Sequence, residues 1–365
     1  MTRRARMAAA APGRGRRGGS AVTIDRIAAE AGVSTATVSR VINQPDRVRS
    51  EARERVLAVI KRHHFVSDGL AVGLASRRSR LVGLLIPTIT NSIYALSTQA
   101  IQRVAQQAGY TVLVGISDFS PEREEQLVQK LLERRVDGLI LTGETRSPAI
   151  YEKLRRNLVP FIITWRLTSD PSLPSVSFDN RKATFAAVDH LVALGHRRIG
   201  LICGRSEVND RALARRDAFA ERLAFHGLAF DATLVFERDF EFVQGRSAMH
   251  LLLQRRPRPT AVFCANDIQA IGALYECVEA GIAVPGEISI VGFDDLPAAQ
   301  YITPQLTTVR VPAEEMGHRA AAMLLQVIAG TQAPGRIELP VDLIVRRSSG
   351  PPPAPRRRSP KRRSR

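Results

Sequence analysis

The chain has 365 residues, of which 44% are hydrophobic, so it is long enough for two or three domains with buried cores. Its formal charge of +18 comes from its ends, because residues 1–20 hold six Arg and no acid, and residues 346–365 hold nine basic residues and no acid. Three scattered cysteines, and the lack of any apolar run of about 20 residues, exclude a disulfide framework and a membrane span.

Residues 1–20 are predicted to be a disordered basic tail. The stretch G-R-G-R-R-G at 13–18 has the letters of a dinucleotide-binding motif, but no strand precedes it, so we expect no cofactor. The apolar residues after Arg6 are too few for an export signal, and further Arg residues follow them. We therefore expect a cytoplasmic protein that makes no contact with a membrane.

Residues 21–66 are predicted to form an all-α domain that begins with two short helices joined by a tight turn. Gly32 can take the left-handed backbone that ends the first helix, and Ser34 can cap the second. The second helix leaves small and hydrogen-bonding side chains outside, which suits a helix that enters the DNA major groove. A helical hairpin with a solvated face is the alternative. The candidate DNA-binding residues of this domain are Thr23, Ser34, Thr35, Ala36, Thr37, Ser39, Arg40 and Asn43.

Ser50 can cap a third helix, which would complete a small helical core. Residues 67–80 are then predicted to be a hinge. Gly69 and Gly73 each lower helix propensity by about 1 kcal/mol, so this segment would be ordered in one state and loose in another. A plain linker is the alternative.

From Leu81 onward, short apolar runs alternate with amphipathic helices, which predicts parallel sheets with crossover helices. The runs form two series, so we expect two α/β lobes with a ligand cleft beyond the carboxyl ends of their strands. The predicted strands are residues 81–87, 110–116, 137–142 and 160–164 in the first series, and 198–204, 233–237, 260–265 and 289–293 in the second.

Polar side chains follow several of these strands, at the edge where a ligand would bind. Carboxylates, amides, an arginine fork and an aromatic plane together suit a polyhydroxylated small molecule. Each residue also has a structural alternative, because Asp267 or Asp294 could cap the next helix and Trp165 could belong to the core. The candidate effector-binding residues at the strand ends are Thr90, Asn91, Trp165, Arg215, Asn266, Asp267 and Asp294.

Six motifs in order carry a family resemblance. They are T-I-D-R-I-A-A-E-A-G-V-S-T-A-T-V-S-R-V-I-N (23–43), I-P-T-I-T-N (86–91), L-V-A-L-G-H-R-R-I-G (191–200), A-N-D (265–267), V-G-F-D-D (291–295) and T-P-Q-L-T-T-V (303–309). Through them, residues 22–347 resemble the lactose/galactose repressor family of bacterial transcription regulators. The resemblance implies a helix-turn-helix headpiece and a two-lobed core like that of periplasmic binding proteins.

The resemblance also implies a homodimer whose second head helix reads a major-groove half-site of a near-palindromic operator. Leu74 would be the hinge residue that inserts into the minor groove. Arg215, Asp267 and Asp294 would bind the effector, and Trp165 and Tyr94 would supply aromatic contacts to it. Lobe 1 would span about residues 81–178 and 307–330, lobe 2 about residues 179–306 and 337–347, and residues 348–365 would be a second disordered basic tail.

Two departures from the family pattern qualify this picture. Ser67, Asp68 and Val72 replace the usual hinge residues, which weakens the expected folding of the hinge. The chain after Arg347 has no Leu heptads, so a tetramer held by a coiled coil is not expected.

We therefore predict a sequence-specific transcriptional regulator, in the first place a repressor, controlled by a small effector between the lobes. Sugar, sugar acid and nucleoside stay open, in that order. An exported-type solute-binding protein shares the two-lobed body and is the alternative, against which the head domain argues. An enzyme is not expected, because no nucleophile–base pair and no metal-spaced His/Cys cluster accompanies Asp267 and Asp294.

Overall fold

The computed structural model describes residues 22–65, 78–168, 170 and 172–354. The chain divides into two units, Met1–Ser79 and Arg80–Arg365. The predicted N-terminal tail, most of the predicted hinge with Leu74, and residues 355–365 lie outside the described residues.

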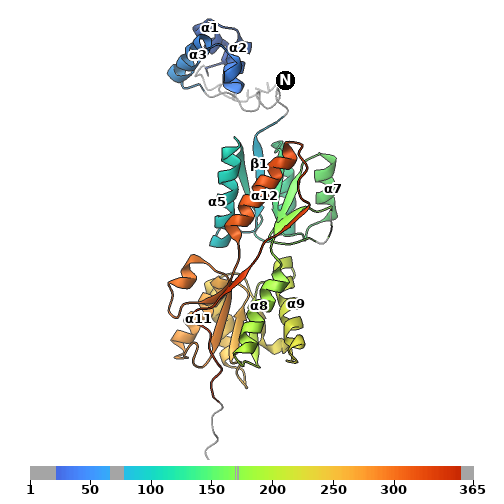
Figure 1. The fold of residues 1–365 in the computed structure, drawn as a ribbon, viewed down its shortest axis with the longest axis vertical. Helices are drawn as coiled ribbons and strands as arrows, with labels where there is room; N and C mark the ends of the chain where they lie inside the picture. The colour runs from blue at the N-terminus through green and yellow to red at the C-terminus, as the bar shows by residue number, and fades with distance from the viewer. Residues whose placement is uncertain (1–21, 66–77, 169, 171, 355–365) are drawn as a thin grey trace, which may run out of the picture. The chain divides into compact units, whose positions relative to one another are not determined.

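The first unit is a three-helix domain, drawn in blue in Figure 1. Gly32 has a φ of 65° and ends the first helix, and the Ser34 hydroxyl accepts a 3.2 Å hydrogen bond from the Thr37 amide, which confirms both predicted roles. Apolar side chains from all three helices form one buried cluster. The elements are α1 (Ile24–Ala31), α2 (Thr35–Asn43), the short 3-10 helix η1 (Pro45–Arg47) and α3 (Ser50–His63).

The predicted cap of α3 is wrong by one residue. Arg49 occupies the N-cap position and makes no side-chain hydrogen bond there, while Ser50 is the first helical residue. A serine with helical backbone is inside the first turn, so its hydroxyl is not in the flanking position from which a cap bonds the free amides.

The second unit consists of two α/β lobes, each built on a six-stranded sheet (Figure 1). All strand pairs are parallel except β10 with β12. Sheet A has the order β11-β5-β4-β3-β1-β2 and sheet B the order β12-β10-β9-β8-β6-β7. The strands of sheet A are β1 (Leu81–Ile86), β2 (Thr111–Ile116), β3 (Gly138–Thr142), β4 (Phe161–Thr164), β5 (Ser175–Ser177) and β11 (Arg336–Glu338). Those of sheet B are β6 (Ile199–Cys203), β7 (Val235–Glu237), β8 (Ala261–Cys264), β9 (Ser289–Asp294), β10 (Thr307–Arg310) and β12 (Asp342–Ile344).

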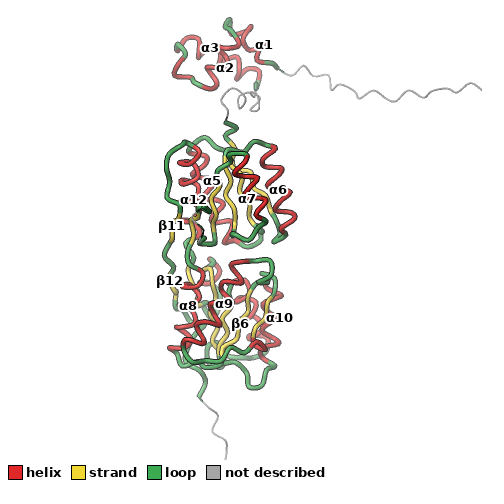
Figure 2. The backbone as a smooth tube through the Cα atoms, turned by 90° about the vertical axis from the view of Figure 1, so that its right-hand side faces the viewer, coloured by secondary structure: helices red, strands yellow, loops and turns green. Residues whose placement is uncertain are grey.

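Helices cover both faces of each sheet, as Figure 2 shows. In lobe 1, alternate strand residues turn Leu84 toward α5 and α12 and Leu85 toward α6 and α7, which is why each strand reads as a continuous apolar run. Lobe 2 repeats this plan with α8 and α9 on one face and α10 and α11 on the other. The helices are α5 (Ser92–Gln107), α6 (Pro121–Glu133), α7 (Pro148–Arg156), α8 (Asn180–Ala193), α9 (Asp210–Phe225), α10 (Phe242–Leu253), α11 (Asp267–Glu279) and α12 (Ala313–Ile328), with 3-10 turns η2 (Ala232–Leu234) and η3 (Pro297–Gln300).

The lobe boundaries differ from the predicted ones at two places. Residues 307–310 form β10 of sheet B, whereas we expected them in lobe 1, and residues 336–338 form β11 of sheet A, where lobe 2 was expected to begin. The chain therefore crosses between the lobes three times, after β5, β10 and β11. All eight predicted strands are confirmed, and the four that were missed are short and are rich in polar residues.

The predicted C-terminal tail also begins too early. Ser348 is fully buried, donates to the Ile290 carbonyl at 2.6 Å and accepts from the Thr307 amide at 2.8 Å. His196, from the L-G-H-R-R-I-G motif, is likewise buried and lies 2.9 Å from the Gly350 carbonyl, to which its Nε2 donates. Residues 348–350 are thus part of lobe 2, because buried polar groups of the lobe need them as hydrogen-bond partners.

Candidate DNA-reading helix and effector site

The outer surface of α2 presents the residues predicted to contact DNA. Thr35, Ala36 and Arg40 are exposed, while Thr37 and Ser39 are half-buried. The side chain of Asn43 and the whole of Leu74 lie outside what the structure describes. A side of α2 with short polar residues and one arginine is therefore free of the head's own core.

Two of the predicted DNA-binding hydroxyls also hold helix ends. Ser34 caps α2 and lies 2.9 Å from the Thr37 hydroxyl, and Thr23 caps α1 by accepting from the Arg26 amide. A contact that the sequence did not indicate joins α1 to α3, since Glu30 accepts a bond from His63 at 2.5 Å. His63, together with Arg26, lowers the pKa of Glu30.

Six of the eight predicted effector-binding residues line one cavity between the lobes. They are Asn91, Tyr94, Trp165, Arg215, Asn266 and Asp294, and Ile93, Asn209, Arg211, Ala212 and Phe240 complete the lining. The cavity volume is about 20 Å³, which is room for about one water molecule. A sugar-sized molecule enters only if the lobes separate or the lining side chains move.

The other two predicted residues are not in this cavity. Asp267 is fully buried, where its carboxylate accepts from the Thr308 hydroxyl at 2.6 Å and from the Leu296 amide at 2.8 Å. It therefore joins β10 to the segment after β9. Thr90 is exposed and lies with Thr88 in a larger outer cleft of about 790 Å³.

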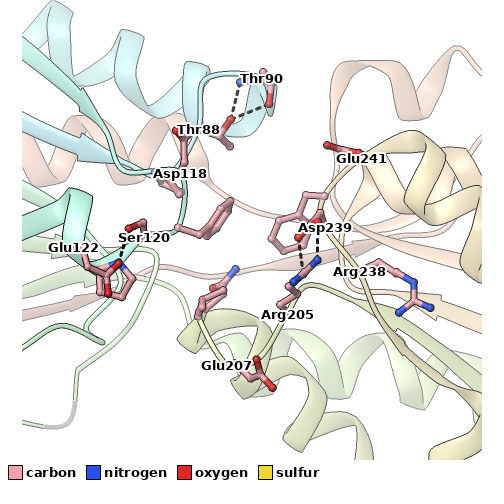
Figure 3. Close-up of a pocket in the computed structure, with 16 residues that line it drawn as sticks. Thr88, Thr90, Asp118, Ser120, Glu122, Arg205, Glu207, Arg238, Asp239 and Glu241 are labelled. Atoms are coloured by element: carbon pink, nitrogen blue, oxygen red, sulfur yellow. Dashed lines mark hydrogen bonds and ion pairs between the residues drawn. The ribbon is translucent and has the colours of Figure 1, made fainter.

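The outer cleft lies between residues that follow strands of both lobes (Figure 3). Its lobe 2 wall carries an ion pair between Arg205 and Asp239, 2.9 Å apart. Phe119 from lobe 1 and Phe240 from lobe 2 approach to 5.9 Å between ring centroids. Phe240 lines both the outer cleft and the small inner cavity.

Asparagines at three helix starts shape the inner cavity. Asn91, Asn209 and Asn266 are the N-caps of α5, α9 and α11, which follow β1, β6 and β8. Each uses its side-chain oxygen to accept a backbone amide of its own helix, so its NH₂ group is the end left for other partners. Asn266 rather than Asp267 caps α11, and Asp267 does not line the cavity, so the structure gives that aspartate neither of the two roles considered for it.

Arg215 is a buried cation of the cavity, with 6% of its surface exposed. Its guanidinium stacks on Phe293 at 3.7 Å from the ring centroid, donates to the Asn180 side chain at 2.8 Å and donates to the Ala265 carbonyl at 2.7 Å. Burial lowers the pKa of Arg215 to about 10. The side chain still carries its positive charge near neutral pH.

Asp294 is the carboxylate that lines the cavity. Its Oδ2 accepts a 2.6 Å hydrogen bond from Asn266, and its backbone has a φ of 121°, a region that non-glycine residues rarely adopt. Burial raises the pKa of Asp294 to about 7, although nearby Arg215 opposes the shift. The group is therefore partly protonated near neutral pH.

Trp165 is both a core residue and a lining residue, so neither alternative alone was correct. It is buried, packs edge-on against Tyr94 at 4.9 Å and has Phe178 at 6.5 Å. Its backbone takes a φ of 67°, and its carbonyl accepts from Asn180. Tyr94 and Trp165 thus give the lobe 1 wall its apolar surface.

Asp210 fastens the lobes together, and neither Asp210 nor its partner Arg211 was predicted as a site residue. The Asp210 carboxylate of lobe 2 accepts from the lobe 1 backbone amides of Glu144 at 2.6 Å and Thr145 at 3.2 Å. Arg211 pairs with Asp210 at 2.6 Å. No spacing rule in the sequence indicates the contact of Asp210 to Glu144, which is 66 residues away.

Two known protein families match different parts of the chain, one in the head domain and one in the two-lobed unit. Residues 23–68 match the bacterial regulatory proteins of the lacI family, and residues 188–349 match a periplasmic binding protein-like domain. The HTH-type transcriptional repressor CytR of Escherichia coli (strain K12) is 31% identical over 331 residues, which cover 90% of this chain and 97% of that protein. The chain belongs to the lacI family. Catabolite control protein A of Priestia megaterium is 32% identical over 324 residues, or 87% of this chain and 98% of that protein.

Solved structures of the lacI family agree with this assignment. The lac repressor dimer bound to operator and the anti-inducer ONPF has a TM-score of 0.80 and 29% identity, covering 90% of this chain and 99% of that chain. The complex of the transcriptional regulator CelR with cellobiose has a TM-score of 0.67 and 31% identity, with the same coverage. This lacI-family chain is a DNA-binding transcription regulator with an effector domain, and not an enzyme.

None of the helices in the described part of the chain is long and apolar enough to cross a membrane. No group of three or more His, Cys, Asp or Glu side chains in that part of the chain is placed to hold a metal ion.

Proposed function

We propose that the protein is a repressor that binds a near-palindromic operator as a homodimer and responds to a small polyhydroxylated effector held between its lobes. It acts in the cytoplasm, where the DNA is. The observation that carries the proposal is the inner cavity, where polar side chains from both lobes meet in a chain that also has a DNA-reading head. A ligand that contacts both lobes favours one angle between them over another.

The exposed side of α2 is the proposed reading surface. Thr35 and Ala36 lie in its first turn and Arg40 one turn later, all exposed to solvent. Such a helix lies in the major groove with its N-terminal residues near the base edges. Arg40 can donate to the two acceptors of a guanine or to a phosphate.

An apolar surface on α10 and α11 supports the proposed homodimer. Phe242, Val243, Tyr275 and Val278 are between 55% and 64% exposed, although α10 and α11 cover one face of sheet B. We call these four residues the α10–α11 patch. Large apolar side chains grouped on neighbouring helices are typical of an interface, and one self-complementary patch suits a twofold dimer.

Solved structures of relatives support binding to both DNA and a small molecule. The lac repressor dimer was solved with operator and an anti-inducer, and CelR with cellobiose. The same two partner classes are proposed for this chain. A switch between nearly full and nearly absent operator binding requires about 10⁴-fold differential affinity of the effector for two lobe arrangements.

The operator is testable with the full-length protein. Selection from random DNA followed by fluorescence anisotropy should give a near-palindromic site that binds more tightly than bulk DNA. Arg40→Ala should lower the preference for that site by about tenfold or more, because one base contact is worth about 1–3 kcal/mol. Arg62→Ala, at an exposed residue in the last turn of α3, is the control and should change specific and bulk affinity alike. Equal affinity of the wild-type protein for all duplexes would refute the proposal.

A further inference from the structure

The charged groups around the inner cavity indicate the chemical class of the effector better than the shape of the cavity does. Within the described part of the chain, Arg215 donates only to neutral oxygens, those of Asn180 and Ala265, and forms no ion pair. A guanidinium has five N–H donors, so some of its donors remain for a ligand. A buried cation without a hydrogen-bonded anion is costly, and a ligand anion at this point would remove that cost.

Three helix N-termini add to the positive potential. The helices α5, α9 and α11, of 16, 16 and 13 residues, all begin at asparagines that line the cavity. The N-terminal end of a helix carries a partial positive charge, and its free amides favour anions. Their caps are neutral asparagines. The helix α5 has no acid in its first turn, and the first-turn acids of α9 and α11, Asp210 and Asp267, are each engaged by other partners.

The acids near the cavity do not cancel this potential. Asp210 is already engaged by Arg211 and by two backbone amides of lobe 1. Asp294 accepts a hydrogen bond from Asn266. Because burial raises its pKa, Asp294 holds its proton to a higher pH than an ordinary aspartate. With Arg211 paired to Asp210, the positive charge of Arg215 is opposed in the lining only by Asp294, which is partly protonated near neutral pH.

We propose that the effector is a carboxylated monosaccharide, with its carboxylate on Arg215 near the starts of α9 and α11 and its hydroxyls on the asparagine amides and Asp294. The inference rests on the proposed function and narrows it to one chemical class. A planar carboxylate matches the arginine fork in two parallel hydrogen bonds. The walls from Tyr94 and Trp165 offer an apolar surface to the carbon skeleton.

A phosphorylated sugar fits this lining less well than a carboxylate. A phosphate monoester brings close to two negative charges near neutral pH and three acceptor oxygens. The cavity offers one unpaired guanidinium, since Arg211 is held by Asp210. A neutral sugar would leave Arg215 without an anion in a closed site.

Trp165 is the only tryptophan in the chain and lines the cavity, so its fluorescence reports binding directly. The full-length protein is titrated with a panel of hexonates and hexuronates, including D-gluconate and D-glucuronate. The comparison ligands are D-glucose, D-glucose 6-phosphate and adenosine. We expect at least one acid to give a saturable change in Trp165 fluorescence. Its neutral counterpart should bind at least about tenfold more weakly. Tighter binding of a neutral sugar, a phosphate or a nucleoside than of every acid would overturn the proposal, and so would no response to any acid.

Variants at Arg215 provide a second measurement. Arg215→Gln should remove the preference for acid over neutral sugar, and Arg215→Lys, which keeps the charge and loses the fork, should retain part of it. A preference that survives in Arg215→Gln would contradict the proposed contact. If Arg215→Gln does not fold, the wild-type comparison of ligands still decides. Operator selection is measured separately, so loss of DNA binding and a wrong effector class give different results.

Discussion

Asp267 and Asp294 are both carboxylates at the carboxyl ends of neighbouring strands, yet the structure uses them differently. Asp267 turns into lobe 2, where Thr308 and the Leu296 amide satisfy it. Gly292 makes room for it, because a Cβ at that position would collide with the Asp267 carboxylate. Asp294 turns into the cavity and keeps one contact to Asn266. One of the two is a structural group, and the other is available to a ligand.

The raised pKa of Asp294 predicts that the stability of the folded chain depends on pH. Its pKa is about 7 in the folded chain against an ordinary value of 3.8, so the native state binds a proton that the unfolded chain has lost. The contribution of this group to stability is therefore full below about pH 4 and is lost as the pH rises through 7.

Asp294→Asn should remove that loss. From pH 5 to 8, the free energy of unfolding of the wild type should fall relative to the variant by something of the order of 2 kcal/mol. Urea denaturation followed by Trp165 fluorescence at several pH values measures it. Asp342→Asn, at an exposed residue of β12, is the control and should follow the wild type. Parallel curves for wild type and Asp294→Asn would contradict the assignment.

Helix starts show how single elements are held in place. In the head, Ser34 caps α2 through its hydroxyl, whereas Ser50 is already inside α3 and makes no cap bond. In the body, three asparagines cap the helices that surround the effector cavity. A cap both satisfies a free amide and fixes the direction in which the helix leaves its turn.

The two serines of the head give a matched pair of variants. Ser34→Ala should destabilise α2 by about 1 kcal/mol and speed amide exchange in α2 by about fivefold, because the Thr37 amide loses its acceptor. Ser50→Ala should change exchange in α3 little. Hydrogen exchange with mass spectrometry on the full-length protein measures both. Equal effects of the two substitutions would show that the Ser34 cap is not the cause.

At the scale of the whole molecule, the effector domain is one unit of two lobes that the chain connects three times. Asp210 fastens lobe 2 to the lobe 1 loop at Glu144 and Thr145, and the Phe119–Phe240 contact joins the lobes at the outer cleft. Separation of the lobes costs these contacts and opens the cavity to a ligand. We therefore expect the proposed small-molecule binding to be coupled to the lobe angle through these residues.

The proposed homodimer is also a property of the whole molecule, and variants of the α10–α11 patch test it. Tyr275→Asp or Val278→Glu introduces a charge into the α10–α11 patch, and each should convert the dimer to a monomer, because burying an unpaired charge is unfavourable. Sedimentation velocity measures the change, and operator affinity should fall with it. Leu158→Glu, at a residue that is 89% exposed in lobe 1, is the control and should remain dimeric. A dimer that survives both patch variants places the interface elsewhere.

Sequence periodicity was sufficient for the elements that bury continuous apolar faces. Eight strands, the helix-turn-helix and the two-lobed α/β class follow from runs such as L-V-G-L-L-I and from the Gly32 and Ser34 turn. It was not sufficient for β5, β10, β11 and β12, which have three or four residues each. Strands such as S-V-S and R-I-E have no pattern of their own and exist because a neighbouring strand pairs with them.

The sequence by itself determined which residues stand at the carboxyl ends of the strands, because strand order along the chain and parallel pairing are enough for that. Only the tertiary structure decided which of their side chains meet. Asn209 and Phe240 line the cavity and Asp267 does not, since the direction of a side chain depends on backbone angles and on partners far along the chain. The charge balance around Arg215 is decided in the same way, because burial and distance to acids exist only in the folded protein.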